Sequence, residues 1–186
     1  MIRSLLAVLI VVLLAGCGGV ESVSLEGEST AAATHERPVG TKIGHIAPGF
    51  TLPRLDQEGE LTLEELRGNV VVVTFWASWC GPCRREIPAL ESAWRKLKDE
   101  DAVVLGVSVD DTEAKAEDFL GMFPVSYPMV FDASGGKVGN PWGARSIPMT
   151  VIVDKRGVIR RKHLGYTPQQ VKGVVQEVEE LLQEKI

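Results

Sequence analysis

The stretch VVVVTFWASWCGPC, residues 70–83, decides the fold. Its first seven residues are all β-branched or aromatic, which is typical of a strand that is buried on both faces of a covered sheet. The CGPC tetrapeptide follows directly, and a helical pattern then runs from about Pro82 to Lys98. Two cysteines are therefore expected at the turn between a central strand and the beginning of a helix.

The flanking sequence extends this unit into an alternation of strands and helices. Two short strands are expected before residue 70, at the entry segment 47–52 and at 61–63, with the turn-forming residues DQEGE (56–60) between them. The later elements are strands at Val103–Val109, Pro128–Phe131, Pro148–Val153 and Val158–Lys162, and helices at Thr112–Phe123 and from Thr167 onward. This order predicts an α/β fold in which a central mixed sheet is flanked by helices on both faces.

The last helix carries the clearest local signals. Thr167 is expected as its N-cap, Pro168 occupies the first helical position, and Gln170 is expected to complete a capping box. Six apolar residues then recur at helical spacing and predict one buried stripe. They are Val171, Val174, Val175, Val178, Leu181 and Leu182.

Composition is that of a globular protein and argues against several functions. Of the 186 residues, 45% are hydrophobic and 24% are charged, which is ordinary for a single domain with a sizeable core. The formal net charge is −5 and no basic block occurs, so a nucleic-acid partner is not expected. The three histidines are scattered along the sequence, so no metal centre is expected either.

The N-terminus has the composition of an export signal. Arg3 precedes an uninterrupted apolar run at 5–15, which is shorter than the about 20 residues of a membrane span. The run ends in LAGC (14–17), which resembles a bacterial lipobox, where the signal is cut before the cysteine and the Cys17 thiol carries a diacylglycerol. An ordinary signal peptide and an uncleaved anchor are the alternatives. All three place the domain outside the cytoplasm.

These features divide the chain into three parts. Residues 1–16 form the predicted lipoprotein signal peptide. Residues 17–42 comprise the lipidated Cys17 and a small, polar tether that is expected to be flexible. Residues 43–186 form the predicted folded domain, which would be anchored by lipid to the outer face of a bacterial membrane or within the periplasm.

Three roles are open to the pair Cys80 and Cys83. A structural disulfide is a poor explanation, because closing so short a ring restricts the unfolded chain by only about 2 kcal/mol. A zinc site is also poor, because one C-x-x-C supplies only two ligands and no second pair exists. The remaining role is a redox-active disulfide, which requires no separate cofactor.

The position of the pair explains how such a disulfide would work. At a helix N-terminus the free N–H groups and the helix dipole favour an anion, so the pKa of a thiol there falls to about 7 or below. Cys80 is expected to be the exposed thiolate that attacks a disulfide, and the more buried Cys83 to resolve the mixed disulfide. Between them, Gly81 permits the turn and Pro82 sets φ for the beginning of the helix.

This sequence resembles the thioredoxin superfamily. The residues that carry the resemblance are the stretch 75–83, Pro88 within the helix, and Ile147-Pro148 before the later hairpin. The closer resemblance is to the extracytoplasmic, membrane-tethered TlpA/ResA/CcmG type of thiol–disulfide oxidoreductase. It covers about residues 43–185 and includes the entry pattern APGFTL (47–52) and the pattern LEELRG (63–68).

The resemblance implies a thioredoxin-like fold with an N-terminal β extension and an αβ insertion, here at about 110–140. It also implies that the Ile147–Pro148 bond is cis and lies against the cysteines, where its backbone would hold the substrate chain. Trp79, Gly81 and Pro82 would complete this substrate-binding surface.

One position departs from thioredoxin itself. Cytosolic thioredoxins keep a buried aspartate six residues before the first cysteine, and Thr74 stands there in this chain. The resemblance to the tethered type suggests Glu86 instead, because it lies three residues beyond Cys83 on the same helix face. A half-buried carboxyl there would have a raised pKa and could accept the Cys83 proton. A solvated glutamate paired with Arg84, Arg85 or Lys98 is the alternative.

The sequence therefore predicts an enzyme that reduces particular protein disulfides outside the cytoplasm. Through the resemblance, its substrates would include apocytochrome c or proteins with copper-site cysteines, and a membrane thiol carrier would supply electrons. One alternative is a thiol peroxidase, because peroxiredoxins share the Ala-Pro-x-Phe entry, but their Pro-x-x-x-Thr-x-x-Cys arrangement is absent. Another is a copper-binding chaperone with His163 as a ligand, although such relatives separate their cysteines by three residues.

Overall fold

The computed structural model describes residues 37–184, and the predicted signal peptide, Cys17 and most of the tether lie outside them. Within the described residues a five-stranded mixed sheet has the order β5-β4-β3-β6-β7. The strands are β3 (Val70–Trp76), β4 (Ala102–Ser108), β5 (Met129–Phe131), β6 (Met149–Val153) and β7 (Ile159–Leu164). β3 lies in the centre, parallel to β4 and antiparallel to β6, and all seven of its residues are buried. The prediction of a doubly buried central strand is confirmed.

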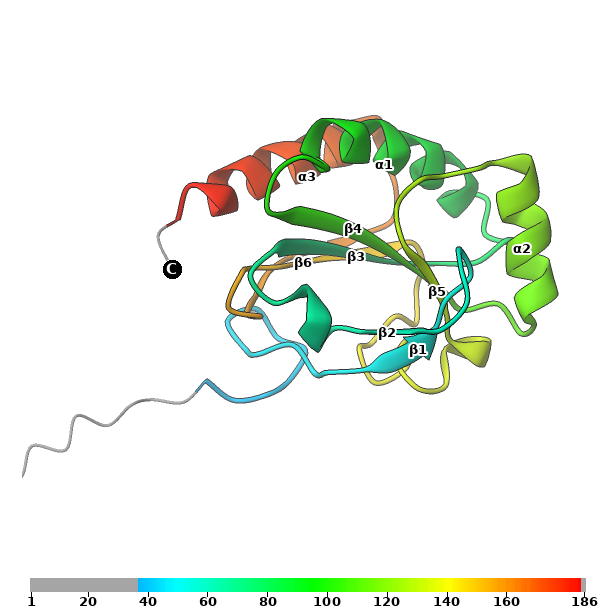
Figure 1. Cartoon of the computed structure of the whole chain (residues 1–186), viewed down its shortest axis with the longest axis horizontal. Helices are drawn as coiled ribbons and strands as arrows, with labels where there is room; N and C mark the ends of the chain where they lie inside the picture. Colours follow the sequence, from blue (N-terminus) through cyan, green and yellow to red (C-terminus); the bar gives the residue numbers. More distant parts are fainter. Residues whose placement is uncertain (1–36, 185–186) are drawn as a thin grey trace, which may run out of the picture. The chain divides into compact units, whose positions relative to one another are not determined.

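The α-helices gather on one face of this sheet. α1 (Cys83–Leu97) and α3 (Pro168–Leu182) lie side by side over it, and α2 (Glu113–Met122) packs at the end of the same layer (Figure 1). Apolar residues of all three helices share a single core cluster with one face of β3. The expectation of helices on both faces was therefore wrong for the described part of the chain.

Shorter elements cover the opposite face. They are the hairpin β1 (Thr51–Pro53) with β2 (Glu60–Thr62) and the 3-10 turns η1 (Glu64–Leu66) and η2 (Ala133–Gly135). Trp142 fills the second core cluster, with its ring centroid 5.8 Å from that of Phe50 and 5.7 Å from that of Phe75. The N-terminal hairpin and the αβ insertion of α2 and β5 appear where the sequence placed them.

Strand alternation decides which side chains of β3 and β6 can meet the helices. Val71, Val73 and Phe75 enter the second core, so Thr74 points to the opposite face, which carries α1 and α3. On β6 the neighbours of Thr150 likewise enter the second core, and Thr150 is the register partner of Thr74. Both threonines therefore face α1.

The last helix begins as predicted, with one exception. Thr167 accepts a hydrogen bond from the Gln170 backbone N–H, and Pro168 is the first helical residue. The Gln170 side chain donates to the Leu164 carbonyl, so the reciprocal half of the capping box is missing. The six predicted apolar residues all contribute to the core that α3 shares with α1. Across residues 37–184, no helix combines the length and the hydrophobicity needed to cross a membrane.

Candidate functional site

Cys80 and Cys83 form a disulfide at the junction of β3 and α1, with 5.3 Å between their Cα atoms. Ala77 to Pro82 form the turn between strand and helix, and Cys83 is the first residue of α1. The Cys80 carbonyl accepts the first helical bond, from the Arg84 N–H at 3.1 Å. The cysteine pair therefore occupies the N-terminus of α1, as the sequence predicted.

The two sulfurs differ in their surroundings. Cys80 is 5% exposed and Cys83 is fully buried, so both cysteines are buried in this disulfide form and the predicted exposed Cys80 presents only a narrow edge. The Cys83 backbone N–H points at Cys80 Sγ from 3.2 Å. A hydrogen bond of this kind favours a thiolate on Cys80 once the disulfide is reduced.

A short ring of exposed groups surrounds the Cys80 edge. Trp79 is 67% exposed, and Gly81 and Pro82 are exposed beside it. The Ile147–Pro148 peptide bond is cis, and the Ile147 carbonyl oxygen lies 3.6 Å from Cys80 Sγ. The structure thus brings these predicted binding residues to the one sulfur that has any exposed surface.

Glu86 is more deeply buried than the sequence suggested. Its side chain lies on the inner face of α1 and is 4% exposed, and no ion pair joins it to any residue of the described region. Thr74 Oγ1 donates to one carboxylate oxygen at 2.9 Å, and Thr150 Oγ1 donates to the other at 3.0 Å. The solvated alternative, with Arg84, Arg85 or Lys98 as partner, is therefore excluded.

This environment brings the pKa of Glu86 close to neutral pH. Burial disfavours the carboxylate and raises the pKa of Glu86 from 4.5 to about 7. The two threonine hydroxyls and the positive charge that His163 can carry lower the pKa, but by less than burial raises it. A group with this pKa exists in both protonation states at neutral pH, as a proton carrier requires.

Sequence reasoning missed the part that two threonines play. Thr74 was recognised only as the residue that replaces an aspartate, whereas its hydroxyl holds Glu86. Thr150 carried no signal, because a threonine in the buried run MTVIV is an ordinary strand residue. Its register pairing with Thr74 brings the two hydroxyls to one carboxylate.

A second buried carboxylate, also missed, holds the loop that carries the cysteines. Asp110 follows β4 and is fully buried, and it accepts bonds from the Ser78 N–H at 3.0 Å and the Ser78 hydroxyl at 2.8 Å. The Ser108 hydroxyl donates to it as well, at 2.9 Å. Asp110 thereby ties the segment two residues before Cys80 to the neighbouring strand.

Asp110→Ala should destabilise the oxidised protein by about 3 kcal/mol, because three donors would lose their acceptor in the interior. For a domain of this size, that corresponds to a fall in Tm of about 10 °C. Asp111→Ala is the matched control, since the adjacent carboxylate is exposed and pairs with exposed Lys115. Thermal unfolding of both variants measures the difference. Equal losses would contradict the structural role of Asp110.

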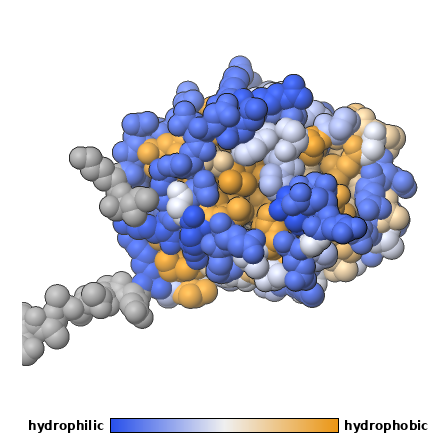
Figure 2. Space-filling view, viewed as in Figure 1, coloured by the Kyte–Doolittle hydropathy of each residue, from blue (hydrophilic) through white to orange (hydrophobic). Residues whose placement is uncertain are grey.

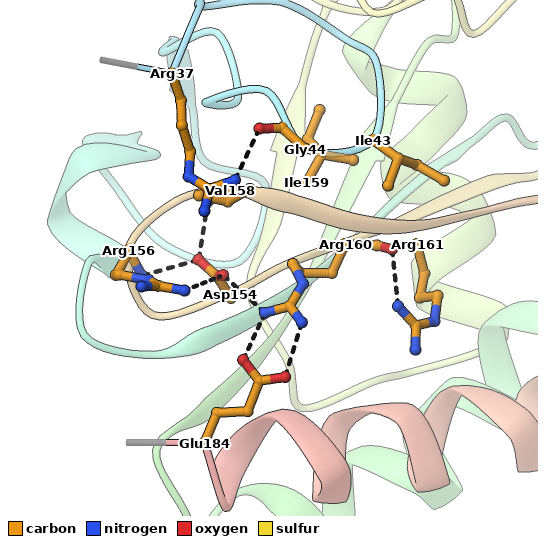
Figure 3. Close-up of a pocket in the computed structure, with 10 residues that line it drawn as sticks. All are labelled: Arg37, Ile43, Gly44, Asp154, Arg156, Val158, Ile159, Arg160, Arg161 and Glu184. Carbon is orange, nitrogen blue, oxygen red and sulfur yellow. Dashed lines mark hydrogen bonds and ion pairs between the residues drawn. The ribbon is translucent and has the colours of Figure 1, made fainter. Parts of the chain in front are cut away.

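A separate cavity of about 260 Å³ lies among arginines and carboxylates at the β6–β7 turn and the end of α3 (Figure 3). Arg160 bridges Asp154 at 3.1 Å and Glu184 at 2.6 Å. None of the predicted site residues lines this cavity. The Arg160 ion pairs join the last helix to the sheet at this place.

His163, the ligand expected in the copper-chaperone alternative, has a hydrogen-bond partner within the fold. Its Nε2 lies 2.7 Å from a carboxylate oxygen of Glu177 on α3. Its neighbour in the sheet is Thr150, which places it on the helix-covered face. The histidine therefore belongs to the surroundings of Glu86 and has a partner within the fold.

Comparison with known proteins agrees with this geometry. Residues 43–162 match the AhpC/TSA family. The thioredoxin-like protein YneN of Bacillus subtilis is 33% identical over 70% of this chain and 76% of its own length, and the thiol–disulfide oxidoreductase ResA of Bacillus cereus is 28% identical over 74% and 79%. A Chlorobium tepidum structure described as a thiol:disulfide interchange protein DsbE superposes with a TM-score of 0.72 and 30% identity, covering 77% of this chain and 99% of that one.

The names of these relatives and the Cys80–Cys83 disulfide agree on one chemistry. The AhpC/TSA description leaves room for a peroxidase, but the peroxidase arrangement is missing, since Val73 and Ala77 occupy its proline and threonine positions before Cys80. The protein is a thiol–disulfide oxidoreductase. By sequence, fold and site, the chain belongs to the AhpC/TSA family of thioredoxin-like proteins, among relatives of the ResA and DsbE type.

Proposed function

We propose that the protein reduces selected protein disulfides outside the cytoplasm, with Cys80 as the attacking thiol, Cys83 as the resolving thiol and Glu86 as the proton acceptor. The observation that carries the proposal is the asymmetry of the pair. Cys80 alone has exposed surface, while Cys83 is buried on the helix that also carries buried Glu86. An attacker that reaches the surface by a narrow edge and a fully buried resolver suit a reaction with two successive exchanges.

In the first exchange the reduced enzyme acts through the Cys80 thiolate. Its sulfur forms a bond with one sulfur of the substrate disulfide, the substrate S–S bond breaks, and the second substrate sulfur leaves as a thiolate that takes a proton from water. The Cys83 N–H, which lies 3.2 Å from Cys80 Sγ in the disulfide form, would stabilise the attacking thiolate. The product is a mixed disulfide between Cys80 and the substrate.

In the second exchange Cys83 passes its proton to the Glu86 carboxylate and attacks Cys80 Sγ. The mixed disulfide breaks, the first substrate sulfur leaves as a thiolate, and the Cys80–Cys83 disulfide of this structure is formed. The substrate has gained two electrons and the enzyme has lost two. A membrane thiol carrier would restore the dithiol and complete the cycle.

The substrate chain would lie across the exposed edge of Cys80. There the Ile147 carbonyl is close enough to pair with a substrate backbone N–H while the substrate sulfur meets Cys80. Trp79 supplies an exposed apolar surface next to Gly81 and Pro82. Apocytochrome c and proteins with copper-site cysteines, which the sequence resemblance implies, are the proposed substrates.

A direct assay tests this function. The reduced protein, mixed with an equimolar peptide that contains one disulfide, should convert it to the dithiol and end as the Cys80–Cys83 form. The same protein should consume hydrogen peroxide far more slowly. Rapid peroxide consumption without peptide reduction would favour the peroxidase alternative instead.

Cys17→Ala should abolish lipid attachment and leave the folded domain intact. The reason is that the lipobox cysteine is the proposed site of the diacylglycerol, and it lies 26 residues before the predicted beginning of the domain at 43. Metabolic labelling with a radioactive fatty acid, followed by membrane fractionation, measures the change. Label retained by the variant would rule out the lipoprotein assignment.

A further inference from the structure

Three exposed arginines lie within two residues of Cys83 or Ile147 along the chain. Arg84 and Arg85 lie in the first turn of α1 directly after Cys83, and Arg145 lies two residues before Ile147, whose carbonyl touches Cys80. The whole chain carries a net charge of −5. The positive charge near Cys80 is therefore a local feature of an acidic protein.

The described structure provides no carboxylate for these arginines. Across residues 37–184 no acidic group lies within ion-pair distance of Arg84, Arg85 or Arg145. In the same region exposed Arg37 and Arg67 also have no carboxylate within this distance, whereas five other arginines do. They are Arg54, Arg95, Arg156, Arg160 and Arg161.

Aromatic rings hold two of the three arginines in place. The Arg84 guanidinium carbon lies 5.9 Å from the ring centroids of both Phe119 and Phe123, and that of Arg85 lies 6.0 Å from Tyr166. A guanidinium against an aromatic face keeps its N–H groups free to bind a carboxylate. The rings therefore fix the positions of both guanidinium groups, while no carboxylate in the described fold neutralises their charge.

A groove beside Arg84 has a mixed polar and apolar lining. Its volume is about 240 Å³, and it is lined by Ser78, Arg84, Lys115, Asp118, Phe119 and Met122. Met122 is 63% exposed, and Figure 2 shows hydrophobic residues reaching the surface at the end of the domain where α2 lies in Figure 1. Lys115 is held by Asp111, and Asp118 is the acidic group of the groove. Arg84 thus lies between the redox site and a groove in which Phe119 and Met122 are the apolar residues.

We propose that Arg84, Arg85 and Arg145, here called the arginine collar, select substrate polypeptides in which acidic residues flank the disulfide. The occupant is a segment of the substrate chain, with its carboxylates on the arginines and an apolar side chain in the groove next to α2. The proposal rests on the proposed disulfide reduction and adds a substrate class to it. The complementary charges steer the encounter and set the register of the substrate cysteine over Cys80.

Two cyclic peptides test the collar with the reduced full-length protein. They share one disulfide and differ only in carrying two glutamates or two lysines next to the cysteines. The parent should reduce the acidic peptide with the higher kcat/KM, and the ratio of the two values should approach one in high salt. Arg84→Gln should lower this ratio about threefold, the order expected when one exposed ion pair is lost.

Two further variants distinguish selection from other effects. Arg84→Lys keeps the charge and should retain most of the preference in kcat/KM for the acidic peptide. Lys96→Gln removes an exposed charge near the far end of α1 and should leave this preference unchanged. If Arg84→Gln slows both peptides by the same factor, the arginine acts on the Cys80 thiolate and the collar is refuted. Equal rates for the two peptides in the parent would refute it as well. If the parent reduces neither peptide, the proposed function itself fails and the collar fails with it.

Discussion

Cys83→Ala should accumulate mixed disulfides between Cys80 and its substrates in the cell envelope, and its turnover of a peptide disulfide should fall by roughly three orders of magnitude or more. The first exchange needs only the Cys80 thiolate, whereas release of the substrate needs the second sulfur. That sulfur is fully buried next to Cys80 in the parent, so no substrate thiol can readily replace it. Non-reducing separation followed by mass spectrometry identifies the trapped proteins.

The matched variant is Cys80→Ala, which should trap far less because the remaining thiol has no exposed surface. Equal trapping by the two variants would show that the roles assigned from burial are wrong. A trapped cytochrome would support haem-protein maturation, and a trapped copper-oxidase subunit would support copper-site assembly. Absence of any trapped protein would argue against protein disulfides as substrates.

Glu86→Gln should change how stability depends on pH. The pKa of Glu86 is about 7 in the folded protein and 4.5 without the fold, so folding favours the protonated form. Stability contributed by this proton is fully present below pH 4.5 and is lost as the pH rises to about 7. The difference between the two pKa values corresponds to about 3 kcal/mol. The variant lacks this group. Relative to the parent, its free energy of unfolding should therefore rise by about 3 kcal/mol between pH 4 and pH 8.

Glu91→Gln provides a control on the same helix with the opposite sign. Burial opposes ionisation of Glu91, but hydrogen bonds from Ser126 and Arg95 outweigh it and lower the pKa. Glu91 therefore contributes stability above its unfolded pKa and loses it as the pH falls. Denaturant unfolding of both variants between pH 4 and pH 8 separates the two cases. Parallel pH profiles for parent and Glu86→Gln would contradict the raised pKa.

Glu86→Gln should also alter the pH dependence of disulfide reduction. The parent should lose activity as the pH falls through about 7, because a protonated Glu86 cannot accept the Cys83 proton. The variant cannot accept the Cys83 proton at any pH. It should therefore show no change of activity near pH 7 and should reduce disulfides more slowly than the parent above pH 7. Single-turnover reduction of a peptide disulfide, measured across this range, gives the profile. A profile identical to that of the parent would remove Glu86 from the reaction.

The core of the fold could be predicted because its signals are local. The run VVVVTFW gave the central strand, and the helical pattern after Cys83 gave α1, so the cysteines were placed at the junction without any tertiary information. The cis bond at Ile147–Pro148 came from the family resemblance and is confirmed. These features depend on short spacings along the chain.

The distribution of the helices over the sheet could not be predicted in this way. Helical periodicity shows that a helix has an apolar side, but not which face of the sheet that side covers. The face opposite α1 is covered by the β1–β2 hairpin and by Trp142, which lies in the irregular segment between β5 and β6. Such a segment has no periodicity to interpret.

By itself, the sequence determined the chemistry of this protein, because a CGPC pair between a buried strand and a helix places a thiol at a helix N-terminus through local geometry alone. Only the tertiary structure decided how Glu86 is held. Thr74 is 12 residues from Glu86 and Thr150 is 64 residues from it, and strand register brings both hydroxyls to one carboxylate. The tertiary structure likewise left the arginines near Cys80 against aromatic rings instead of carboxylates. Burial and long-range pairing, which set the pKa of Glu86 and the charge around Cys80, have no counterpart in the order of residues along the chain.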